Sequence, residues 1–194
     1  MIEPLPQGQF RFVALDVETA NGESASICQI GLACVDSRDT LVSWMSYVDP
    51  LTPFAAFNTK LHGISAQTVD GAPTFAQLWP SLLPFLSAQP LVQHSRFDEH
   101  AINAACELNA IKKPRLVWHD SVKIARQAWP ELKGNGGHGL ASLKEHLHLE
   151  FEHHDAEEDA RAAAMVVLRA EAYGAKRDAV HAINATPFQL PLPF

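Results

Sequence analysis

The N-terminal part of the chain consists of apolar runs separated by short polar breaks, a pattern typical of β-strands. Three such runs predict strands over residues 10–16, 26–35 and 41–48. Only the polar turn 36–39 separates the second run from the third. We therefore expect these strands to pair as an antiparallel meander.

Beyond Pro50 the chain shows apolar residues at helical spacing, interrupted by two short apolar runs. Phe75, Leu78, Leu82 and Leu86, for example, fall on one face of a helix. Strands that alternate with helices indicate an α/β domain, in which a mixed sheet (the antiparallel meander plus parallel strands) is flanked by α-helices. The expected helices cover residues 74–87, 97–109, 121–129, 140–147 and 155–173, and the expected strands cover 91–93 and 116–118.

The C-terminal end of the chain has a different character. Residues 186–194 contain three prolines and no apolar periodicity. We expect one domain over residues 1–175 and a flexible tail over residues 176–194.

The composition suits a folded domain and disfavours one class of DNA-binding protein. Hydrophobic residues make up 47% of the chain and charged residues 19%, so a core can form. The net charge of −7 lacks the basic footprint of a protein that coats duplex DNA non-specifically. It is compatible with an enzyme that meets nucleic acid through bound cations, because such cations invert the local charge.

Cysteine usage and the N-terminus indicate the compartment. The three cysteines form no CxxC pair, which disfavours a disulfide scaffold and a cysteine-ligated zinc site. The N-terminus lacks the basic-then-apolar pattern of a signal peptide, and no apolar stretch reaches the roughly 18 residues of a membrane span. We expect a cytoplasmic protein that does not bind membranes.

Acidic residues recur where predicted strands end. Asp16 and Glu18 close the first strand, and residues at i and i+2 project from the same strand face. Two such carboxylates repel each other unless a cation lies between them or one is protonated. The alternative is a polar strand end that enters a turn.

Asp98 lies just beyond the expected strand 91–93, at the sheet edge where open α/β proteins bind ligands. Ser95-Arg96-Phe97-Asp98 also fits a helix capping box, which would give Asp98 a purely structural role.

Six acids and no Lys or Arg occur between Glu150 and Asp159. An acidic helix start exposed to solvent is the simplest interpretation. Asp155 suits the N-cap position with Glu158 three residues later. His154 then precedes the cap and Asp159 is the fourth helical residue, and these two positions meet at a helix entry.

Taken in order, Asp16-x-Glu18-Thr19, Phe97-Asp98 and His154-x₄-Asp159 resemble the three motifs of the DnaQ-like (DEDDh) 3′→5′ exonucleases. The epsilon subunit of DNA polymerase III is of this type. The resemblance extends to 27–31, 61–64 and Asp120-Ser121. It implies a ribonuclease H-like fold.

The resemblance also implies the roles of the site residues. Four acids would hold two divalent metal ions, Mg²⁺ or Mn²⁺. Asp16 would bridge the ions, Glu18 and Asp159 would hold one, and Asp98 would support the other. His154 would be the general base, and Thr19 and His62 would contact the terminal nucleotide.

The chemistry of these residues agrees with that assignment. Carboxylates are hard oxygen ligands that suit Mg²⁺ or Mn²⁺ better than zinc. Two such ions, roughly 3.5–4 Å apart, activate water and stabilise the leaving oxygen of a phosphodiester. A histidine with an ordinary pKa of about 6.5 accepts the proton of that water near neutral pH.

A glycine-rich segment supplies a competing signal. Gly134-x-Gly136-x-x-Gly139 matches the dinucleotide-binding fingerprint, but it follows a predicted helix rather than a strand. We expect a mobile loop beside the active site instead.

The sequence therefore predicts a metal-dependent 3′→5′ exonuclease that acts on single-stranded or frayed DNA ends and releases nucleoside 5′-monophosphates in DNA repair or proofreading. An exoribonuclease with the same site is an alternative, because no motif reports on the 2′-OH. A non-catalytic nucleic-acid-binding or scaffolding subunit is another, which the presence of all five site residues disfavours.

The last six residues resemble the hexapeptide by which bacterial proteins bind the sliding clamp. Gln189, Leu190, Leu192 and Phe194 occupy its specified positions. Prolines 191 and 193 restrict the free peptide to extended shapes, which lowers the cost of ordering it. The alternative is that the apolar side chains fold back onto a groove of the domain.

Overall fold

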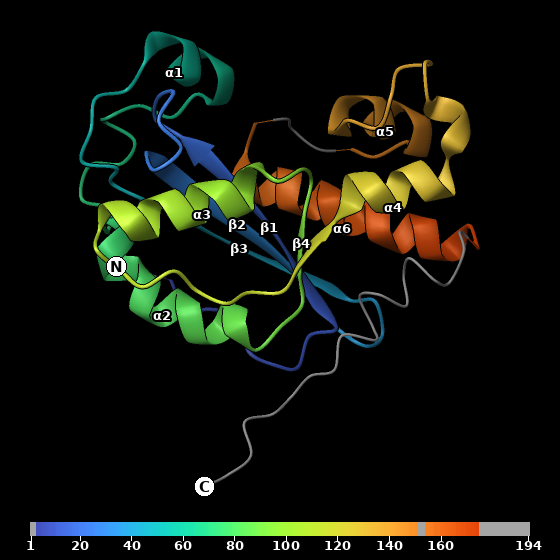
Figure 1. The fold of residues 1–194 in the computed structure, drawn as a ribbon, viewed down its shortest axis with the longest axis horizontal. Coiled ribbons are helices and arrows are strands. Elements are labelled where there is room, and N and C mark those ends of the chain that lie inside the picture. The colour runs from blue at the N-terminus through green and yellow to red at the C-terminus, as the bar shows by residue number, and fades with distance from the viewer. Residues whose placement is uncertain (1–2, 151–153, 175–194) are drawn as a thin grey trace, which may run out of the picture.

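A five-stranded sheet with the strand order β3-β2-β1-β4-β5 forms the centre of the molecule (Figure 1). The structure is a computed structural model, and it describes residues 3–150 and 154–174. The first three strands pair antiparallel, whereas β4 and β5 run parallel to β1. The mixed sheet is as predicted. The strands are β1 (Phe12–Thr19), β2 (Ile27–Val35), β3 (Leu41–Tyr47), β4 (Leu91–Gln93) and β5 (Trp118–Asp120).

Helices cover both faces of the sheet (Figure 1). On one face, α2 and α3 pack against Val13 and Leu15 of β1. On the other, α4, α5 and α6 pack against Phe12 and Ala14. The helices are α1 (Ala56–His62), α2 (Phe75–Ser87), α3 (Phe97–Leu108), α4 (Ser121–Ala128), α5 (Leu140–Leu147) and α6 (Ala156–Ala172), with a 3₁₀ turn, η1, at Pro130–Leu132.

Alternation along β1 explains these two layers. Successive side chains of a strand point to opposite faces, so even- and odd-numbered residues enter different cores. Small alanines at 160, 163 and 164 let α6 lie close to the sheet, and all three are buried.

Two strands differ from the prediction. β1 covers 12–19, whereas its apolar run predicted 10–16 with the acids at the strand end, and β5 covers 118–120 instead of 116–118. In both cases polar residues extend the strand toward the carboxyl edge of the sheet, where an apolar pattern cannot reveal them.

None of the described helices is long and apolar enough to cross a membrane. The predicted tail 176–194, with its candidate clamp-binding residues, lies outside the described residues.

Candidate active site

The carboxyl end of β1 carries two acids on the sheet face that α6 covers. Asp16 and Glu18 continue the face of Phe12 and Ala14, and both line one hollow of about 270 Å³. The pairing register with β2 shifts between Glu18 and Thr19. Such irregularities bend a strand locally and re-aim its side chains. The prediction that the two carboxylates share a face is confirmed.

Asp98 reaches the same hollow from the first turn of α3, and its side chain is almost fully buried. β4 pairs with β1 only at Val13 and Ala14, so the sheet opens beyond that point. There the Val17 N–H donates to Asp98 Oδ1 over 3.1 Å. The Val17 N–H, which would bond to β4 if the pairing of the two strands continued, thus holds the Asp98 carboxylate in place.

The capping-box interpretation of Ser95 to Asp98 is wrong. The N-cap of α3 is Arg96, whose own side chain makes no capping hydrogen bond. Ser95 Oγ accepts from the Phe97 N–H at 3.3 Å. Asp98 therefore belongs to the acidic hollow and not to a helix cap.

Contacts between β2 and the start of α6 position the third acidic segment. Gln29 is fully buried, and its Nε2 donates to Asp155 Oδ2 over 3.1 Å while its Oε1 accepts from the Ala156 N–H over 3.0 Å. A Cβ at Gly31 would lie 2.0 Å from the Ala156 carbonyl oxygen, so only glycine permits this approach. Asp155 accepts from the N–H groups of Glu157 and Glu158, which confirms it as the N-cap.

His154 and Asp159 meet at this helix entry, as predicted. The backbone N–H of His154 donates to Asp159 Oδ2 over 3.0 Å. The backbone of His154 is in the left-handed region, with a φ of 68°. Ligand atoms of Glu18, His154 and Asp159 all lie within 4.8 Å of one another. Asp98 of α3 lines the same hollow, so side chains from three distant parts of the chain meet there.

The electrostatics of the hollow favour bound protons or cations. Burial raises the pKa of Glu18 to about 8, and the negative charges of Asp159 and Asp98 add to the shift. Burial likewise raises the pKa of Asp98 to about 7, although the Val17 N–H opposes the shift. Burial, and then the charge of Asp98, raises the pKa of Asp16 well above its usual range. At neutral pH the carboxylates therefore share protons unless a cation replaces them.

The donor set fits divalent metal ions. Asp16, Glu18, Asp98 and Asp159 offer carboxylate oxygens, and His154 lies beside them. Hard cations prefer oxygen ligands, and their charge would offset the repulsion among the acids. The described part of the chain thus contains a buried site that can hold a metal.

Helix α1 forms the other wall of the hollow. His62 Nε2 donates to the Thr19 carbonyl oxygen over 3.1 Å, and its Nδ1 accepts from the Ile64 N–H over 3.0 Å. Both ring nitrogens thus contact backbone, and burial lowers the pKa of the ring. Asn58 and the exposed Leu61 line the hollow; Leu61 belongs to the segment 61–64 that carries the family resemblance, whereas the sequence analysis missed Asn58.

A chain of hydrogen bonds joins the hollow to the glycine-rich loop. His94 lines the hollow, and its Nε2 donates to the His138 carbonyl oxygen over 3.0 Å. Its Nδ1 lies 2.8 Å from Ser121 Oγ, which donates to the Gln93 carbonyl oxygen. The position of the loop beside the site agrees with the prediction.

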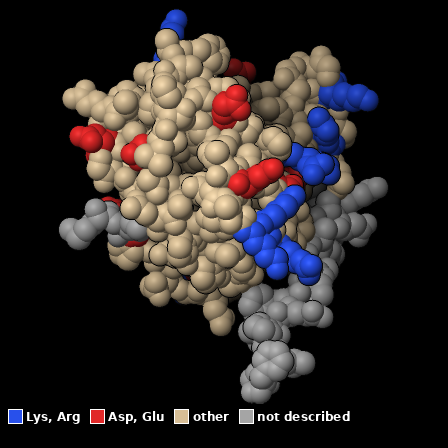
Figure 2. Space-filling view, turned by 60° about the vertical axis from the view of Figure 1, so that its left-hand side comes forward, with Lys and Arg blue, Asp and Glu red and all other residues tan. Residues whose placement is uncertain are grey.

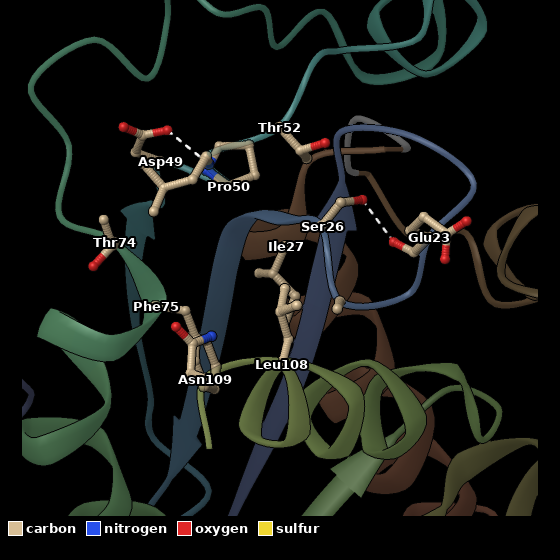
Figure 3. A pocket seen from close by; sticks show the side chains of 12 residues that line it. Glu23, Ser26, Ile27, Asp49, Pro50, Thr52, Thr74, Phe75, Leu108 and Asn109 are labelled. Atoms are coloured by element: carbon tan, nitrogen blue, oxygen red, sulfur yellow. Dashed lines mark hydrogen bonds between the residues drawn. The ribbon is translucent and has the colours of Figure 1, made fainter. Parts of the chain in front are cut away.

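A larger hollow of about 500 Å³ lies elsewhere (Figure 3). Ser26 and Ile27 form one wall, and Phe75 and Leu108 form another. It contains none of the acids of the first hollow. Glu23 and Asp49 are the acids of its described lining, and no histidine is among the described lining residues.

Comparisons with known proteins agree with this geometry. Residues 13–167 match the model of the RNase_T exonuclease family. A DNA polymerase III PolC-type protein of Caldanaerobacter subterraneus subsp. tengcongensis is 28% identical over 162 residues, which cover 81% of this chain and 11% of that protein. The chain thus spans about a tenth of the length of the curated relatives that it matches.

Two solved structures show the same fold. A 3′-exonuclease described by its 3′-end-specific recognition of a histone mRNA stem-loop has a TM-score of 0.73 at 18% identity, covering 88% of this chain and 85% of its own. Exonuclease X, in complex with 5′ overhanging duplex DNA, has a TM-score of 0.64 at 19% identity, covering 84% and 92%.

Proposed function

The chain belongs to the RNase_T exonuclease family, and we propose that it is a metal-dependent 3′→5′ exonuclease that shortens single-stranded or frayed DNA ends. The supporting observation is the hollow in which four buried or half-buried carboxylates and one histidine converge. The raised pKa values of Asp16, Glu18 and Asp98 mean that these acids retain protons at neutral pH in the metal-free protein. A bound cation would replace those protons.

Each acid has a role in this proposal. Asp16 is close enough to Asp98, Asp159 and Glu18 for their charges to raise its pKa, and it would bridge two ions; Glu18 and Asp159 would hold one, and Asp98 would support the other. When bound, Mg²⁺ or Mn²⁺ supplies an activated water and a charge that stabilises the leaving oxygen.

His154 acts as the general base. Its imidazole takes a proton from the attacking water, whose oxygen forms the new bond to phosphorus. The bond between phosphorus and the 3′ oxygen of the preceding nucleotide breaks, and that oxygen gains a proton. The products are a nucleoside 5′-monophosphate and a strand shortened by one nucleotide. The hydrogen bond from the backbone N–H of His154 to the Asp159 carboxylate keeps this residue beside the acids.

Thr19 and His62 form the binding site for the terminal nucleotide in this proposal. His62 bonds to the Thr19 carbonyl oxygen, and Asn58 Nδ2 donates to the same oxygen over 2.9 Å. Because the ring nitrogens of His62 contact backbone, its contribution is to hold the Thr19 segment. Leu61, with 41% of its surface exposed, offers an apolar contact for the sugar or base.

Degradation of labelled oligonucleotides tests the function. Strands of DNA labelled at the 5′ end should shorten stepwise in Mg²⁺ or Mn²⁺, and EDTA should stop the reaction. Asp16→Ala should abolish turnover and retain the circular dichroism of the wild type, because removing one of four repelling acids does not disrupt the core. A label at the 3′ end should appear at once as mononucleotide.

Parallel reactions with duplex DNA and RNA decide the substrate class. Faster shortening of RNA would favour the exoribonuclease alternative. Intact strands under all these conditions, with the wild type, would reject catalysis and favour the scaffolding alternative.

We further propose that residues 1–175 form the catalytic domain and that Gln189, Leu190, Leu192 and Phe194 bind a bacterial sliding clamp. These residues lie outside the described part of the chain, so the proposal rests on their resemblance to the clamp-binding hexapeptide. The curated relatives, DNA polymerase III proteins, act in the same replication context. A tether would raise the local concentration of an acidic enzyme on DNA.

Deletion of residues 189–194 tests the tether. Activity on short single-stranded DNA should be unchanged, whereas binding to an immobilised clamp should be lost. Equal clamp binding by the truncated and full-length proteins would refute it.

A further inference from the structure

A second hollow adjoins the acidic one. It has a volume of about 470 Å³ and shares Phe97 with the acidic hollow. Phe97 is the first residue of α3, and 44% of its surface is exposed. A strand that ends at the carboxylates can therefore continue past this ring. The lining consists of Arg96, Phe97, Glu99, His100, Asn103 and Lys113.

The shape of this second hollow follows from helix geometry. Arg96, Glu99, His100 and Asn103 are three or four residues apart and form one stripe along α3. At about 1.5 Å per residue, the stripe extends roughly 10 Å from the catalytic end of the helix. Lys113, from the segment after α3, also lines the hollow. The lining therefore follows α3 away from its catalytic end.

The charge of the lining is positive where it meets solvent. Glu99 is its only acid and pairs with Arg96 at 3.7 Å. Lys113 is exposed, and within residues 3–150 and 154–174 no carboxylate pairs with it. Its ammonium group is thus available to an anion.

Basic residues also outnumber acidic residues over a longer stretch of the chain. Residues 96–144 contain eight Lys and Arg against five Asp and Glu, whereas the rest of the chain contains seven against seventeen. Figure 2 shows Lys and Arg gathered along one side of the molecule. Just over half of the basic residues of this acidic protein thus lie on the segment that includes the second hollow.

We propose that this second hollow binds the strand on the 5′ side of the scissile bond. Lys113 and Arg96 contact its phosphates, and Phe97 stacks on the base next to the terminal nucleotide. Stacking on an exposed aromatic ring tolerates every base, so the contact would not require a particular sequence. The proposal rests on the exonuclease function; Arg96 and Lys113 lie outside the catalytic motifs, and Phe97 precedes the motif acid Asp98.

Substitution of Lys113 tests the proposal. Lys113→Ala should raise the KM for a single-stranded DNA decamer and leave kcat unchanged. One phosphate contact changes the logarithm of the binding constant by about 0.7 per tenfold change in salt, which corresponds to roughly fivefold in KM at about 0.1 M. The slope of log KM against log salt should fall by the same 0.7.

Lys112→Ala is the matched control. Lys112 is an exposed neighbour with the same charge, but it does not line the hollow. Its substitution should leave the KM and the salt slope within about twofold of the wild type. The p-nitrophenyl ester of thymidine 5′-monophosphate provides a second control, because it has no strand on the 5′ side. Lys113→Ala should hydrolyse this ester at the wild-type rate.

The outcomes separate the two proposals. If the wild type hydrolyses neither substrate, the exonuclease function fails and the strand-binding proposal with it. If the wild type hydrolyses the decamer but Lys113→Ala and Lys112→Ala have the same KM and salt slope, only the strand-binding proposal is overturned. A loss of ester hydrolysis in Lys113→Ala would also overturn it, because the residue would then act on the reacting centre.

Discussion

Removing the charge of Glu18 should stabilise the metal-free protein at alkaline pH. Burial and two neighbouring acids raise the pKa of Glu18 from 4.5 to about 8. The folded protein therefore keeps a proton on Glu18 at pH values where the unfolded chain has lost it. Unfolding releases that proton, so the free energy of unfolding falls as pH rises from about 4.5 to about 8. Glu18→Gln removes this penalty because an amide does not ionise.

The size of the effect follows from the shift. One pKa unit corresponds to about 1.4 kcal/mol, so the full shift sets an upper limit of about 5 kcal/mol above pH 8. Asp16 and Asp98 titrate in the same hollow, and protons redistribute among the acids when one is neutralised. We therefore expect Glu18→Gln to be more stable than the wild type by about 1–3 kcal/mol at alkaline pH.

Urea unfolding in EDTA, followed by the fluorescence of the buried Trp44, Trp79 and Trp129, measures the difference. The difference in the free energy of unfolding between Glu18→Gln and the wild type should be largest above pH 8 and should disappear below pH 4.5. Glu107→Gln, at an exposed position on α3, is the control and should show no such trend. A gap that does not change with pH, or a variant that is less stable than the wild type in EDTA at pH 8.5, would refute the reasoning.

Two further substitutions test other parts of the site. His154→Ala should lower kcat by roughly 10²–10⁴-fold, and calorimetry should show that Mn²⁺ still binds; loss of Mn²⁺ affinity would make His154 a ligand or a support instead. Gly31→Ala should destabilise the protein by about 3 kcal/mol or more in urea unfolding, because its Cβ would lie 2.0 Å from the Ala156 carbonyl oxygen; unchanged stability would show that α6 can move away from β2.

The sequence was informative where a short-range rule fixes the geometry. The two-residue period of a strand places Asp16 beside Glu18, and the geometry of a helix entry places His154 beside Asp159. Apolar periodicity likewise predicts α5 from Leu140 to Leu147 with the observed bounds. These rules connect residues at most five positions apart.

Contacts between distant residues could not be predicted in this way. Asp98 fitted two local interpretations, of which the helix cap was locally the stronger, and the deciding contact is a hydrogen bond to Val17, 81 residues away. The bond from Gln29 to Asp155 spans 126 residues. Asn58 and Leu61 enter the site because the end of β1 packs on α1, which no local pattern of their own helix reveals.

The distribution of charge explains how an acidic chain can act on a polyanion. At physiological salt, exposed charges more than about 8 Å apart are largely screened, so the net charge of −7 matters less than the charges near the reacting strand. Cations in the acidic hollow would attract the scissile phosphate, and Lys113 and Arg96 would attract the phosphates that follow. Without cations the acids repel the strand end while the basic stripe still binds its 5′ side. Removal of metal should therefore stop turnover more completely than it weakens strand binding.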